Sequence, residues 1–107
     1  MTRILKHLHR GVAVVRLEGE LGPDRAEDLE RALDVPPGDR VLLDLRGTCH
    51  LHHRLALRLV RLAQAGHPVG LVGPSPYIRQ ILRFAGALDG DLREYPDLRE
   101  ALEDEVA

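Results

Sequence analysis

Short apolar runs alternate with amphipathic segments along the chain, and this alternation predicts strands separated by helices. Residues 4–9 and 12–18 are rich in aliphatic and β-branched side chains and meet at Arg10-Gly11, which is typical of two strands joined by a tight turn. Residues 41–45 and 69–72 are nearly continuous apolar runs, the pattern of central strands that are covered on both faces. A further short strand is predicted near residues 92–95.

Four helices are predicted from apolar residues that recur at helical spacing between and after these strands. The first follows Gly22-Pro23-Asp24 and ends at segment 34–38, the second covers about 53–65, the third begins at Pro74-Ser75-Pro76 and ends at Gly86, and the fourth covers about 97–103. In the second helix an apolar stripe that includes Leu55 lies opposite a stripe of arginines.

The resulting order is strand, strand, helix, strand, helix, strand, helix, strand, helix. It predicts a single α/β domain over residues 1–107, with a mixed, largely parallel sheet of four to five strands and about four helices. Binding sites in such folds gather at the carboxyl ends of the strands, which here are the segments after Leu45 and after Val72.

Composition and charge narrow the classes of function. The net charge of −2 provides no basic excess for binding nucleic acid. No apolar stretch is long enough to cross a bilayer or to form a signal peptide, so we expect a cytoplasmic protein without direct membrane insertion. The single cysteine, Cys49, excludes an internal disulfide and is expected to be a small buried residue. No cofactor is expected.

Four short motifs resemble, in order and spacing, those of the STAS domain, which is found in anti-sigma-factor antagonists and in the cytoplasmic tails of sulphate transporters. They are Gly19-Glu20-Leu21, Asp44-Leu45-Arg46-Gly47, Val72-Gly73-Pro74-Ser75-Pro76 and Ile81-Leu82-Arg83-Phe84-Ala85-Gly86. The resemblance covers residues from about 4 to 102. It implies a STAS-like domain that is not an enzyme and that acts by docking on a protein partner.

The resemblance also locates the position at which anti-sigma-factor antagonists are phosphorylated. In them an Asp-Ser-Ser-Gly turn opens the helix that follows the strand, and a partner kinase phosphorylates the first serine. The equivalent turn here is His52-His53-Arg54-Leu55, with His53 at the serine position. Serine phosphorylation is therefore not expected there. Thr48 and Ser75 are the candidate phosphoacceptors, but a hydrogen-bonded structural role for Thr48 and a helix-capping role for Ser75 are favoured.

The string Cys49-His50-Leu51-His52-His53 holds three of the six histidines and the only cysteine. One interpretation is a metal site that uses His50, His52, His53 and Cys49, because zinc, nickel and copper prefer such ligands. A second is phosphohistidine or acid–base chemistry at His53. The third, which we favour, is a turn of neutral imidazoles at a docking surface, with no catalytic residue.

Together these features predict a regulatory adaptor that docks through the histidine turn and the helix after it. The expected docking residues are His50, His52, His53, Arg54, Leu55, Arg58 and Arg61, whose arginines could meet an acidic patch. The expected partner is an anti-sigma-factor kinase or another signalling protein. Two alternatives stay open: a small cytoplasmic subunit that stabilises the ATPase of a lipid or solute ABC transporter, and a ligand- or metal-binding module. A homodimer is compatible with each.

Overall fold

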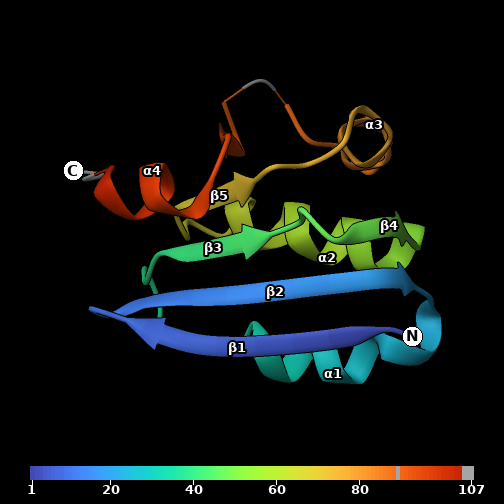
Figure 1. Ribbon diagram of the computed structural model, residues 1–107, viewed down its shortest axis with the longest axis horizontal. Helices are drawn as coiled ribbons and strands as arrows, with labels where there is room; N and C mark the ends of the chain where they lie inside the picture. The colour runs from blue at the N-terminus through green and yellow to red at the C-terminus, as the bar shows by residue number, and fades with distance from the viewer. Residues whose placement is uncertain (89, 105–107) are drawn as a thin grey trace.

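The chain begins with a β-hairpin, as its first two apolar runs predict. In the computed structural model, which describes residues 1–88 and 90–104, β1 (Arg3–His9) pairs antiparallel with β2 (Val12–Leu21) (Figure 1). The two residues between the strands both have positive φ, 50° at Arg10 and 81° at Gly11. A two-residue turn of type I′ requires this conformation at both positions, and its twist matches that of the flanking strands.

The remaining strands extend the sheet with parallel pairing. β3 (Val41–Asp44) pairs with β2, β5 (Val69–Val72) with β3, and β6 (Arg93–Tyr95) with β5, which gives the order β1-β2-β3-β5-β6. The predicted mixed, largely parallel α/β fold is thus confirmed. Within the described residues the sheet has six strands rather than four or five, because residues 48–51 form an additional short strand, β4.

β4 (Thr48–Leu51) exists because β2 is longer than its apolar pattern predicts. β2 runs beyond the end of β3, and its last residues pair in parallel with β4 after a register shift at Gly19 and Glu20. Gly19 has a φ of 87°, and its N–H donates to the carbonyl of Gly47 at 2.9 Å. The chain therefore leaves the sheet after Asp44, turns, and returns to the same neighbouring strand.

The helices cover the two faces of the sheet unequally. α1 (Ala26–Ala32), which follows a 3₁₀ turn at Pro23–Arg25, shares one aliphatic core with α2 (His53–Gln64), α3 (Pro76–Phe84) and the inward side chains of the strands. α4 (Leu98–Glu103) covers the opposite face, where a smaller core forms around Leu42, Val72 and Tyr95. No helix in the described residues is long and apolar enough to span a bilayer.

Candidate functional site

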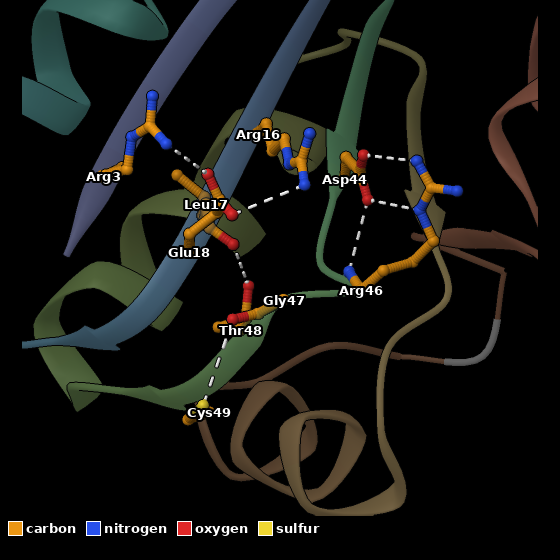
Figure 2. Close-up of polar contacts among 9 residues, drawn as sticks. All are labelled: Arg3, Arg16, Leu17, Glu18, Asp44, Arg46, Gly47, Thr48 and Cys49. Atoms are coloured by element: carbon orange, nitrogen blue, oxygen red, sulfur yellow. Dashed lines mark hydrogen bonds and ion pairs between the residues drawn. The ribbon is translucent and has the colours of Figure 1, made fainter. Parts of the chain in front are cut away.

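The turn between β3 and β4 is closed by an ion pair between Asp44 and Arg46 (Figure 2). Arg46 donates from Nε to Oδ1 at 2.9 Å, from Nη2 to Oδ2 at 2.8 Å, and from its backbone N–H to Oδ1 at 3.2 Å. The Asp44 carboxyl is buried, whereas the Arg46 side chain is 49% exposed.

The charge state of Asp44 follows from these contacts. Burial acts to raise the pKa of Asp44, but hydrogen bonds from Arg46 and the positive charges of Arg46 and Arg16 together lower that pKa below its ordinary value. Asp44 is therefore an anion that holds the turn, and it is unsuited to donate a proton near neutral pH.

Thr48 follows this turn and is buried at the start of β4. Its Oγ1 donates to the backbone carbonyl of Leu17 on β2 at 2.6 Å (Figure 2). This contact confirms the structural role expected from the sequence. A kinase would reach the hydroxyl of Thr48 only after this part of the sheet had opened.

Ser75 precedes α3 and caps it, since its Oγ accepts a hydrogen bond from the N–H of Ile78 at 3.1 Å. The capping role predicted from the sequence is thus confirmed. Ser75 is an exposed residue, and its use as a phosphoacceptor stays a prediction.

The expectation that Cys49 is buried is wrong. Successive side chains of a strand point to opposite sides, and Thr48 takes the inward position in β4. Cys49 consequently points outward and is an exposed free thiol, 4.0 Å from the carbonyl oxygen of Gly47 (Figure 2).

The histidines of the turn make separate local contacts. His50 Nδ1 lies 2.7 Å from Tyr77 Oη, and the two rings stack with their centroids 5.8 Å apart, so β4 is joined to α3. His52 caps α2, because its Nδ1 accepts a hydrogen bond from the N–H of Arg54 at 3.1 Å. His53 is exposed in the first turn of α2.

The proposed metal ligands His50, His52, His53 and Cys49 are therefore not brought together. Across residues 1–88 and 90–104, no group of three or more His, Cys, Asp or Glu side chains is placed to hold a metal ion.

The expected docking residues of α2 divide into three kinds. Leu55 is only 1% exposed and belongs to the core, so its assignment to a docking surface is wrong. Arg58 is half-buried, and its Nε contacts Glu30 Oε1 on α1 at 2.6 Å. Arg54 and Arg61 are exposed.

Two exposed side chains near this site were not among the expected docking residues. Tyr77 is 53% exposed and Phe84 is 76% exposed, both on α3. Tyr77 lies in the predicted third helix and Phe84 in the last of the four motifs, and neither was expected at a docking surface. The spacing places Ile78 and Leu82 in one stripe and Tyr77 and Phe84 in the neighbouring one, but it does not show which stripe the rest of the chain covers.

The chain is similar in structure to several proteins of known structure. No family model matches the chain, and no curated protein matches it. An anti-sigma factor antagonist from Mycobacterium paratuberculosis is similar, with 28% identity and a TM-score of 0.74 over 95% of this chain and 92% of the other.

Two further solved structures share the fold. An anti-sigma-factor antagonist (STAS) domain protein from Planctomyces limnophilus has 22% identity and a TM-score of 0.71, over 95% of this chain and 96% of the other. The phosphorylated form of SpoIIAA, a cell fate determinant of Bacillus, has 20% identity and a TM-score of 0.62, over 96% of this chain and 97% of the other.

Proposed function

We propose that this chain, which has the STAS fold, is a non-catalytic regulatory adaptor that docks on a protein partner. The docking surface, here called the α2 surface, consists of His53, Arg54 and Arg61. These side chains are exposed around the start and along the outer side of α2, and α2 contains no acidic residue. Among the solved structures of this fold are anti-sigma-factor antagonists, which supports a regulatory role.

The α2 surface is proposed as the docking site because its arginine side chains are exposed. The resemblance to anti-sigma-factor antagonists equates His53 with the phosphorylated serine. An imidazole cannot be phosphorylated by serine chemistry, so docking at this position is not switched off by a phosphoserine. Arg54 and Arg61 favour a partner with an acidic patch, because opposite charges steer association and fix orientation.

The proposed partner is an anti-sigma-factor kinase or another cytoplasmic signalling protein, and the chain is proposed to act in the cytoplasm. Capture of an ABC-transporter ATPase would instead favour the alternative of a small transporter subunit. Arg58 contributes less to this surface than its position in the arginine stripe predicts, because Glu30 already pairs with it.

The proposal is tested by affinity capture from the native cell with Arg54→Glu and Arg61→Glu, followed by titration of the identified partner. Arg99→Glu is the matched control, since Arg99 is 87% exposed on α4 at the opposite face of the sheet. We expect each α2 variant to weaken binding about tenfold or more and the control to bind normally.

The melting temperature of each variant distinguishes loss of a contact from misfolding. Arg54 is the second residue of α2, where a negative charge is favourable to the helix dipole, so Arg54→Glu should not lower the melting temperature. Normal binding by both α2 variants would place the interface elsewhere and contradict the proposal.

A further inference from the structure

α3 leaves an apolar stripe uncovered by the rest of the described chain. Tyr77, Ile81 and Phe84 are spaced i, i+4 and i+7, so they lie along one side of the helix, next to the side that buries Ile78 and Leu82. Tyr77 and Phe84 are 53% and 76% exposed, and Ile81 is half-buried. We call these three residues the α3 stripe.

Two side-chain contacts fix the direction in which the α3 stripe faces. Tyr77 contacts His50 on β4, so the stripe lies on the side of α3 toward β4. On the other side of α3, Arg79 pairs with Glu94 of β6. The α3 stripe is therefore turned toward the part of the molecule that holds the histidine turn.

α2 adds to the same surface. Its flank with Arg58 faces α1, where Arg58 pairs with Glu30. Leu57 is half-buried against the core and lies about 100° around the helix from Arg58. Because α2 contacts α1 and α3, we take this flank as the one nearer α3. α2 and α3 pack against each other, so the α3 stripe and Leu57 border one continuous surface.

The charged side chains of α2 and α3 are all cationic, and the acidic residue at the border with β4 is Glu20, the exposed register partner of His50. α2 and α3 contain five arginines and no Asp or Glu, and Arg58 and Arg79 are already paired. No ion pair in the described part of the chain uses Arg54, Arg61 or Arg83. The exposed apolar side chains therefore lie on two helices whose charges are all positive, although the whole chain has a net charge of −2.

We infer that the docking surface extends from α2 across the α3 stripe, and that it binds an acidic amphipathic helix of the partner protein. This inference rests on the proposed function and names the chemistry of the partner. The α3 stripe is about 10 Å long, which matches two turns of a helix whose apolar ridge has Asp or Glu on both sides. An anionic bilayer would offer negative charge as well, and titration with phospholipid vesicles distinguishes it from the acidic helix.

The probes are two synthetic helical peptides that share one apolar ridge and carry either Glu or Lys on both flanks. They are titrated into the isotopically labelled protein, and backbone amide shifts are recorded by NMR. We expect the Glu peptide to bind about tenfold or more tightly than the Lys peptide, to shift amides of α2 and α3, and to weaken as salt is raised.

Phe84→Ser should weaken the Glu peptide about tenfold, because it removes an aromatic ring from the apolar contact. Leu8→Ser is the matched control, since Leu8 is 71% exposed on β1 and lies outside the surface. Equal binding of the two peptides, amide shifts confined to elements other than α2, α3 and β4, or tighter binding to anionic phospholipid vesicles than to the Glu peptide would each overturn the inference.

The same variants separate this inference from the proposed function. If the native partner requires Arg54 and Arg61 but binds Phe84→Ser normally, docking at the α2 surface is supported. The extension of the docking surface onto α3 is then refuted. If the Glu peptide binds as expected while the native partner binds Arg54→Glu and Arg61→Glu as tightly as the wild type, the proposed function is refuted. The preference of the surface for an acidic helix is then still supported.

Discussion

Removal of Arg46 is expected to destabilise the protein in a way that depends on pH. Arg46→Ala deletes both side-chain hydrogen bonds to Asp44 and leaves only the bond from the backbone N–H at 3.2 Å. The carboxylate of Asp44 then remains buried without most of the hydrogen bonds and positive charge that offset the cost of burying it. Breaking a buried ion pair in this way costs about 3–5 kcal/mol in general.

The expected cost here lies at or below the lower end of that range. The Arg46 side chain is 49% exposed, so water can enter the space that it vacates and solvate part of the carboxylate. We therefore expect a loss of about 2–3 kcal/mol in the free energy of unfolding near neutral pH. Asp44→Asn should cost less, about 1–2 kcal/mol, because the freed guanidinium can turn toward solvent.

The sign of the pH dependence follows from the pKa of Asp44. In the native protein this pKa lies below its ordinary value, so the stabilisation is present above about pH 4 and is lost as pH falls through the native pKa. In Arg46→Ala, burial dominates and raises the pKa of Asp44. Protonation then relieves the buried charge as pH falls, and the difference in stability from the wild type should narrow by about 1 kcal/mol.

Urea unfolding followed by circular dichroism, at about pH 7 and about pH 4.5, measures this difference. Arg99→Ala is the control, because Arg99 forms an exposed pair with Glu103 on α4 and should change stability by less than about 0.5 kcal/mol. A deficit for Arg46→Ala that is equal or larger at the lower pH would show that Arg46 does not keep Asp44 ionised.

Three further substitutions test the packing around the site by thermal or urea unfolding. Thr48→Val should cost about 1–2 kcal/mol, because it removes the hydroxyl that bonds the Leu17 carbonyl within the sheet. Ser75→Ala should cost about 1 kcal/mol through loss of the α3 cap. Gly70→Ala should cost about 1–3 kcal/mol, since the added Cβ would lie 2.7 Å from Leu42 Cδ2.

Each of these substitutions has a conservative control. Thr48→Ser keeps the hydroxyl and Ser75→Asp keeps a capping oxygen, so both should retain most of the stability lost in the first two variants. Gly47→Ala adds the same methyl group where the nearest atom is Glu18 Cγ at 3.5 Å, and it should be tolerated. If a control were as damaging as its partner variant, the contact named would not be the cause.

The sequence alone determined the fold class and most of the elements of this protein. The positions of β3 and β5 follow from continuous apolar runs, and α2 follows from leucines and arginines on opposite sides of one helix. These patterns are local, because each element must bury its own apolar side. The capping role of Ser75 was also predicted, since its partner Ile78 is three residues away in the chain. A structural role for Thr48 was predicted from its place after a strand, but its partner, the carbonyl of Leu17, lies 31 residues away and was not predicted.

The composition of the site was decided only by contacts between distant parts of the chain. β4 forms because β2 extends past the end of β3 and pairs with residues Thr48–Leu51. The sequence of these four residues does not by itself indicate a strand. Arg58 is occupied by Glu30, His50 is joined to Tyr77, and Leu55 is enclosed by the core.

The physical reason is that the period of a pattern shows which side of a helix or strand is apolar but does not show what covers that side. Cys49 faces outward because its neighbour Thr48 bonds to β2, and Phe84 is exposed because no described element packs over that part of α3. Exposure of this kind depends on the placement of whole elements, and only the tertiary structure supplies it.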